Sequence, residues 1–595
     1  SNLKTVELET ERDRYGGGFK LNLTNSWQMQ GNYRHEDKEG TDPIGAGFGN
    51  SGGNPRFSIL SQPINFDTDE FDVNIAYTGS KGQASLNYHL SLFENNDGAL
   101  LFDNPFTSPL RGGVRQWALG TDFADGARGR LGTAPDNEAQ QLSFNAGYNL
   151  TDSTRATATI SYGRMTQDDT FLPFTSVPSL SAPIPLPRNS LDGEINTLFA
   201  NLGFTARLAR NLDLKAGYTY DDRDNDTLPR DIYVRIAGDS QNQPGLVSAN
   251  ARINWPYSLE RHKVDLEGGY RIAAMTRLSA GYEFESKSRD FTEVQDTDEH
   301  TMKLKLSASP SDTTSGWIKY QHSTRDGSNY ISNQPLLDGH NPDHISAEIA
   351  ADPESVFEND PLMRKFHIAN RDRDQVSATV NINPYDTVTF TINANYANDD
   401  YKHTEIGLQN GANFNLTLDA TYNPSEDVET YAFITHEKSN YEQAGFYHPG
   451  TAGILGPTTD RVARFGTNFW NVETEDLVNT IGWGGNWVVI QDKFNVKLDF
   501  THSSGTTEIR AYAPALAFLP LPDVESKITS LNLTGEYKFR ENMSVRLGYL
   551  YERFESEDFA LDDITANTLA NVILLGNSSP VYHIHAIGLS LVYEF

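Results

Sequence analysis

An alternation of apolar and polar residues with a period of two recurs along most of this chain. In Asp386–Ala397, one set of alternating positions is apolar and comprises Val388, Phe390, Ile392, Ala394 and Tyr396. The intervening set is polar and comprises Thr387, Thr389, Thr391, Asn393 and Asn395. Successive side chains of a β-strand point to opposite faces, so the pattern predicts a strand with one apolar and one polar face. A sheet built from this many strands must close on itself or split into two layers, which predicts an all-β fold.

Short turn sequences join most of these segments in pairs. We count about 21 strands, or 21–22 within the accuracy of the pattern, and most are paired by turns of two to five residues. The expected hairpins and last strand are Tyr15–Glu36, Thr68–Phe93, Gln141–Met165, Ile195–Asp222, Arg261–Arg289, His300–Ser323, Gln375–Asn398, Ala412–Asn440, Thr474–His502, Lys527–Glu555 and Val581–Phe595.

Long connections alternate with these short turns, most clearly after Phe93, Ser323 and Asn440. Outer-membrane barrels have short periplasmic turns and long extracellular loops, whereas a soluble sandwich has no reason to keep its long loops at one end. The sequence therefore predicts one large antiparallel transmembrane β-barrel over residues 1–595, with no separate plug domain. Several strands exceed the roughly 9–11 residues that cross lipid, so the wall should rise above the bilayer.

The last strand carries a spacing typical of the signal that directs barrels into the bacterial outer membrane. Its residues are Gly588, Leu591, Tyr593 and Phe595. If short turns are periplasmic, this strand and the strand before Thr24-Asn25-Ser26 both run inward. Unless Leu3–Arg12 forms a preceding outward strand, the chain would start outside the cell, which is awkward for a barrel. We therefore expect further strands upstream of Ser1.

Composition limits the partners and the chemistry. The net charge of −32 argues against nucleic acid, because phosphate binding requires a basic surface. The absence of cysteine excludes covalent c-type haem and cysteine-ligated metals in this chain. The chain contains no run of about 18 apolar residues, so no transmembrane helix is predicted. We expect the lumen and loops to be acidic, with mainly Asn, Thr, Ser, Gly and Asp facing inward.

The candidate sites are weak. Asp221, Asp222, Asp224 and Asp226 have the oxygen density of a calcium loop but lack the glycine and final glutamate of an EF-hand. A solvated outer loop is the alternative for this segment. His583 and His585 fit an interfacial pair better than a metal site. No G-x-S-x-G nucleophile elbow occurs, so no enzyme is predicted.

Three segments carry a resemblance to a known family. Pro361–Gly411 reads PLMRKFHIANRDRDQVSATVNINPYDTVTFTINANYANDDYKHTEIGLQNG, Tyr218–Thr227 reads YTYDDRDNDT, and Gly268–Thr301 reads GGYRIAAMTRLSAGYEFESKSRDFTEVQDTDEHT. The chain resembles the MtrB/PioB family, the barrel component of porin–cytochrome complexes. The resemblance implies about 26 strands in the complete barrel and an outer-membrane location. It also implies a periplasmic multihaem cytochrome inside the lumen and, in many members, an outer-surface multihaem cytochrome. Haem would then be carried by the partners, and electrons would cross the outer membrane along it.

The chain departs from the family near its start. Several members carry a paired-cysteine motif near the mature amino terminus, followed by several strands, and neither is present here. This agrees with the expectation of upstream strands. Two other functions remain open from the residues alone: a passive porin or substrate-specific transporter narrowed by loops such as Gly98–Asn137 or Arg325–Asn370, and a secreted β-sandwich array.

Overall fold

The structure is a computed structural model that describes most of the chain. The described residues are 6–50, 55–103, 110–111, 114–115, 128–173, 186–228, 230–234, 251–331, 334–339, 362–446, 466–514, 521–565, 568, 572–573 and 581–593.

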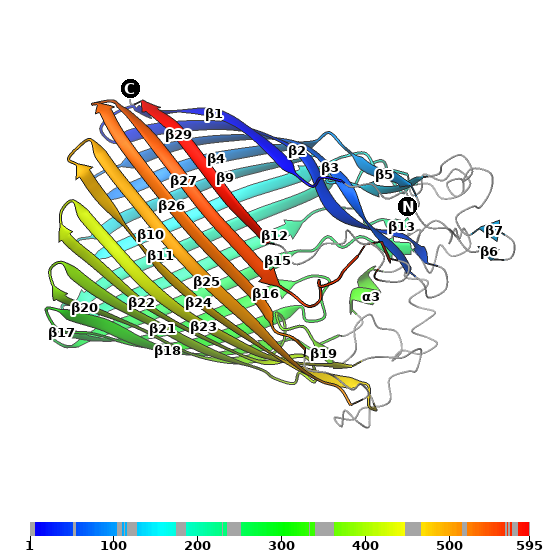
Figure 1. Cartoon of the computed structure of the whole chain (residues 1–595). Coiled ribbons are helices and arrows are strands. Elements are labelled where there is room, and N and C mark those ends of the chain that lie inside the picture. Colours follow the sequence, from blue (N-terminus) through cyan, green and yellow to red (C-terminus); the bar gives the residue numbers. More distant parts are fainter. Residues whose placement is uncertain are drawn as a thin grey trace.

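One large sheet dominates the fold and curves round into a barrel wall (Figure 1). It contains 23 strands, of which β19 (Met363–Arg364) and β28 (Val572–Ile573) are two-residue strands in parallel pairs. The remaining 21 pair antiparallel, which confirms the predicted all-β class and the count. They are β1 (Thr10–Asn22), β2 (Trp27–Asn50), β3 (Pro55–Thr78), β4 (Gly82–Asn95), β9 (Asn137–Thr151), β10 (Thr154–Gln167), β11 (Gly193–Ala209), β12 (Leu212–Asn225), β15 (Leu259–Ala273), β16 (Thr276–Arg289), β17 (Asp296–Ser311), β18 (Thr314–Gly327), β20 (Arg371–Tyr385), β21 (Val388–Tyr401), β22 (Ile406–Ser425), β23 (Val428–Phe446), β24 (Phe469–Ile490), β25 (Phe494–Tyr512), β26 (Val524–Arg540), β27 (Met543–Glu557) and β29 (Val581–Tyr593).

Short turns gather at one end of the barrel and long connections at the other (Figure 1). The turn chemistry explains the short ones: the Thr24 hydroxyl accepts hydrogen bonds from the backbone N–H groups of Ser26 and Trp27, each at 3.1 Å. The hairpins fall where the sequence predicts them. Their strands run further than predicted, because the ladder between β2 and β3 continues through the glycine-rich stretch up to Gly47 opposite Phe57.

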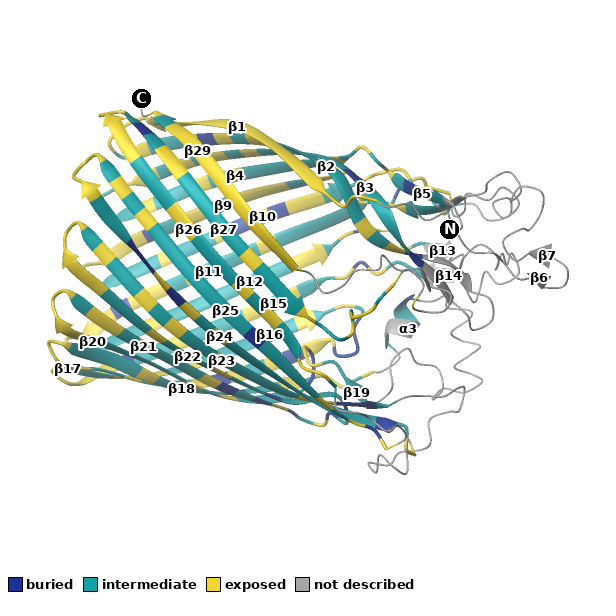
Figure 2. Cartoon of the chain, in the orientation of Figure 1, coloured by how far each residue is buried: buried dark blue, intermediate teal, exposed yellow. Residues whose placement is uncertain are grey.

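The two ends of the ladder are β1, which pairs with β2, and β29, which pairs with β27. Both strands run toward the short-turn end, and no ladder joins them within the described residues. Figure 2 shows both strands exposed along their length.

Smaller elements lie at the long-loop end (Figure 1). They are β5 (Ala99–Asp103) paired with β8 (Arg128–Gly132), β6 (Leu110–Arg111) with β7 (Val114–Arg115), β13 (Ile232–Val234) with β14 (Ala251–Ile253), and the short helix α3 (Gln334–Gly339). In the described part of the chain, no helix is long and apolar enough to cross a membrane.

Within the residues that the structure describes, no second layer covers the apolar face of the wall. Large hydrophobic side chains stand exposed on it, and Ile587 and Leu589 reach 76% and 75% exposure. Burying such a face in lipid instead is favourable by roughly 25 cal/mol per Å² of apolar surface. The barrel is therefore built with its apolar parity toward a membrane.

Candidate functional site

The polar parity forms a hydrogen-bonded inner face. On β20 and β21, Gln375 and Ser377 donate to the side-chain carbonyl of Asn395 at 2.7 and 2.8 Å, and Thr379 donates to Asn393 at 2.7 Å. These polar side chains are less exposed than the apolar ones between them, as expected where side chains crowd on the concave side. The predicted assignment of Thr and Asn to the lumen and Phe390 and its neighbours to lipid agrees with this arrangement.

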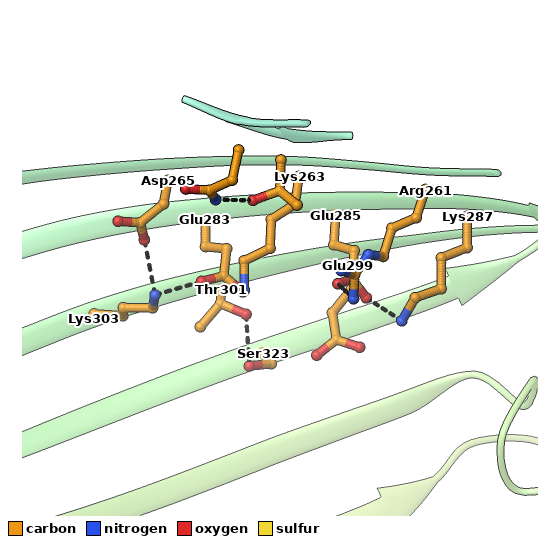
Figure 3. Close-up of polar contacts among 12 residues, drawn as sticks. Arg261, Lys263, Asp265, Glu283, Glu285, Lys287, Glu299, Thr301, Lys303 and Ser323 are labelled. Carbon is orange, nitrogen blue, oxygen red and sulfur yellow. Dashed lines mark hydrogen bonds and ion pairs between the residues drawn. The ribbon is translucent and has the colours of Figure 1, made fainter. Parts of the chain in front are cut away.

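On β15–β17 the inner face carries long charged side chains instead. Lys303 contacts Asp265 at 2.9 Å and Glu283 at 2.6 Å, and Lys263 contacts the other oxygen of Glu283 at 2.7 Å. Figure 3 shows this network, with Arg261 and Lys287 beside Glu285 further along the strands. Opposite charges on neighbouring strands therefore join β15, β16 and β17 across the wall.

Further round the sheet, carboxylates are held by neutral donors. Asn415 donates to Glu437 at 3.0 Å, Thr507 to Asp476 at 2.5 Å, and Tyr582 to Glu552 at 2.8 Å. A neutral donor stabilises an ionised carboxylate without cancelling its charge. The inner face of β22–β29 is thus acidic, as predicted.

Between β12 and β18 the predicted acidic lumen is wrong. Lys215, Lys305 and Lys319 fall on the inward parity, and none has a carboxylate within 4.0 Å among the described residues. The Lys305 ammonium lies 4.4 Å from the centre of the Trp317 ring. A recess of about 570 Å³ opens beside it near the short turns, lined in part by Lys215, Glu267 and Arg277. The net charge of the chain could not reveal this basic part of the inner face, because it sums the charges of the whole wall and the loops. The sequence signal that could have revealed it is the inward parity that the three lysines share.

The outer face has aromatic residues at two levels. Those near the short turns include Trp27, Tyr77, Tyr148, Tyr270, Tyr422, Tyr537 and Tyr593. Those nearer the long loops include Tyr15, Tyr88, Tyr162, Tyr282, Tyr320 and Tyr396. Aliphatic side chains such as Ile160, Leu304 and Ile392 lie between the two levels. Two aromatic girdles around an aliphatic band are the boundary markers of a transmembrane barrel.

Histidines accompany the girdle nearer the long loops. The Tyr218 hydroxyl lies 2.9 Å from Nδ1 of His262, and the Tyr549 hydroxyl lies 2.8 Å from Nδ1 of His585. His583 packs near His585, with ring centres 6.2 Å apart. These contacts agree with the predicted interfacial role of the His583–His585 pair.

At the long-loop end, one segment folds back onto the strand ends. Glu293 is 1% exposed and pairs with Lys365 at 2.6 Å. Arg325 donates to the backbone carbonyls of Phe366 at 2.6 Å and Ala369 at 2.9 Å. Residues 362–370 are thereby fixed to β18 and to the connection between β16 and β17.

The calcium candidates do not converge on one point. Asp221 faces the lumen and pairs with Arg261 at 3.3 Å, whereas Asp222 and Asp224 take the opposite parity on β12. Asp226 follows the strand and accepts a hydrogen bond from Asn196 at 2.8 Å. The described residues include no group of three or more His, Asp or Glu side chains placed to hold a metal ion.

The residues of the insertion signal lie on β29. Leu591 and Tyr593 stand exposed on the apolar parity, Gly588 lies on the opposite parity, and Phe595 lies outside the described residues. That these four residues act as an insertion signal remains a prediction.

Comparison with known proteins identifies the relatives. The family described as outer membrane beta-barrel porin, MtrB/PioB, matches residues 1–595. Outer membrane protein MtrB of Shewanella baltica (strain OS185) is 27% identical over 597 residues, which cover 100% of this chain and 75% of that protein.

Solved structures share the fold at low identity. The FrpB iron transporter from Neisseria meningitidis (F3-3 variant) aligns with a TM-score of 0.52 and 12% identity, covering 98% of this chain and 79% of the transporter. The siderophore receptor PiuA from Acinetobacter baumannii aligns with a TM-score of 0.50 and 11% identity, over 98% and 79% of the two chains. Both share the large β-barrel fold with this chain.

Proposed function

This chain belongs to the MtrB/PioB family of outer-membrane β-barrel porins, and from that premise we propose that it sheathes a periplasmic multihaem c-type cytochrome inside its lumen. The cytochrome would carry electrons across the outer membrane, and the long-loop end would help dock an outer-surface multihaem cytochrome. The barrel itself is an outer-membrane protein of the porin type, and we expect it to have no catalytic activity of its own.

The inner wall is the observation that supports this proposal most. A sheet of this many strands encloses a wide space, and barrels of 22 strands carry a plug. Here the middle of the inner face of β20 and β21 carries short polar side chains that are hydrogen-bonded to each other, which leaves the space in front of them for another protein. A partner supplied in trans would fill the lumen and prevent leakage.

The chain's own chemistry assigns the redox role to the partners. With no cysteine, the barrel cannot attach c-type haem, so it would hold and insulate a conductor. The outward-facing Tyr and Trp rings at the two levels have a structural role as membrane girdles.

The test is electron transfer across liposomes that contain a reducible dye. We expect no dye reduction by an external donor with the barrel alone, and reduction when the barrel is inserted with a multihaem cytochrome. Equal rates in the two preparations would refute the sheath. The competing function is a passive porin or transporter, which predicts large conductance from the freshly isolated complex.

A further inference from the structure

We propose that Lys305 and Lys319 bind carboxylate groups on the protein that occupies the lumen. This inference rests on the proposed sheath function and specifies which part of the inner wall contacts the acidic side of the protein in the lumen. It requires a pair of ammonium groups that face the lumen, lack a partner in the wall and are held in position.

The two lysines lie directly opposite each other on neighbouring strands. The ladder between β17 and β18 pairs Lys305 with Lys319, and side chains opposed in this way have Cβ atoms about 4.5–5.5 Å apart. Like charges placed so closely destabilise a sheet. Lys303 is the next lysine on β17, but its charge is balanced by Asp265 and Glu283. An anion between the two ammonium groups would remove this repulsion.

The wall does not supply that anion. Asp265 and Glu283 are already engaged by Lys303 and Lys263, and Asp213 is engaged by Arg277 and Arg207. Glu267 is the remaining inward carboxylate in this area, and it lies opposite Lys215 in the ladder between β12 and β15. In the part of the wall that the structure describes, three lysines therefore share one carboxylate.

The site is also shaped to receive a side chain from the lumen. The recess of about 570 Å³ beside Lys305 is open to the lumen and carries the hydroxyls of Ser279 and Ser307. Trp317 fixes the Lys305 ammonium by a cation–π contact at 4.4 Å, which limits the side-chain freedom lost when a ligand binds. The rest of the inner wall is acidic on β22–β29, so an occupant with an acidic side and a basic side would be held in one orientation.

Carboxylates on a haem-bearing protein come from Asp and Glu side chains or from haem propionates, and one experiment distinguishes them. A water-soluble carbodiimide converts a carboxylate into an O-acylisourea, and a lysine amine in contact displaces the urea and forms an amide. The native barrel–cytochrome complex is treated with the carbodiimide, digested and mapped by mass spectrometry. We expect amides from Lys305 or Lys319 to the occupant, and the linked fragment identifies the carboxylate as side chain or propionate.

Two double variants separate charge from structure. K305R/K319R keeps both charges but cannot form the amide, so it should retain the cytochrome and lose the cross-link. K305Q/K319Q removes both charges, so the empty barrel should be as stable as the wild type or more stable, while cytochrome retention in 0.5 M salt falls by about tenfold. Lys497→Gln, which removes an inward lysine 3.2 Å from Asp499, is the matched control and should leave retention unchanged.

The outcomes are distinct. Cytochrome retained by K305Q/K319Q as in the wild type, with cross-links only elsewhere, would overturn the carboxylate site and leave the sheath function standing. A wild-type complex isolated without any haem protein would overturn both.

Discussion

The Tyr282 hydroxyl lies 2.6 Å from Nδ1 of His300, and both side chains stand on the lipid-facing side of neighbouring strands β16 and β17. The same pairing occurs between Tyr218 and His262 and between Tyr549 and His585. A tyrosine in an interfacial girdle places its ring toward lipid and its hydroxyl toward polar groups. A neighbouring imidazole gives that hydroxyl a partner that does not depend on water.

Removing one such hydrogen bond should lower the stability of the barrel only slightly, and a double-variant cycle should measure the coupling between the two side chains. We expect Tyr282→Phe and His300→Leu each to lower the free energy of unfolding by about 1 kcal/mol, and the double variant to lose less than the sum. Denaturant midpoints of the barrel in lipid vesicles measure the cycle. Full additivity would show that the two side chains act independently.

Which face meets lipid was readable from the sequence, because a period of two assigns every residue of a strand once one residue is assigned. The hairpins were readable for a similar reason: short polar turns mark them. The pairing of Lys305 with Lys319 was not readable, because it depends on the register between two strands, and a sequence determines parity better than register. The Glu293–Lys365 pair joins connections far apart in the chain, which no local pattern predicts.

A charge on the lipid face should be far worse than one in the lumen. Ile392 is 36% exposed on the apolar parity of β21, and Asn393 follows it on the inner face. We expect Ile392→Arg to cost about 2–4 kcal/mol near mid-bilayer and Asn393→Arg to cost much less. Yields of folded barrel from heat-modified gel mobility compare the two. Equal losses would contradict the facing assignment.

Arg373 and Asp399 should be strongly coupled, because the Asp399 carboxylate is almost inaccessible to solvent. Asp399 is 4% exposed, and Arg373 donates to both of its oxygens at 2.6 Å. Among the described residues, Arg373→Gln would leave that carboxylate with only the 3.6 Å ion pair to Arg371, and it should cost about 2–3 kcal/mol. Adding Asp399→Asn should restore much of the loss. A double variant less stable than Arg373→Gln would refute the coupling.

Residues 362–370 should loosen in mild acid. The pKa of His367 lies below its usual value. The largest cause is that surrounding protein atoms displace part of the water around the ring, although one edge stays exposed, and the second cause is the positive charge of Lys365. Arg289 and Arg325 act in the same direction, and Glu293 opposes them. A lowered histidine pKa means that the folded segment favours the neutral ring. The stabilisation is therefore complete above the unfolded pKa of about 6.5 and is lost as pH falls through the lower folded value.

Hydrogen exchange measures this loss directly. The amides of Ile368 and Ala369 both donate to the Lys365 carbonyl at 3.0 Å, so their protection reports whether the segment is folded. After correction for intrinsic exchange, their protection should fall below pH 6.5 in the wild type. His367→Gln has no group that titrates there, so its protection should stay nearly constant over the same range. Parallel decreases in both proteins would assign the pH dependence to another group, with the buried Glu293 carboxylate next to be tested.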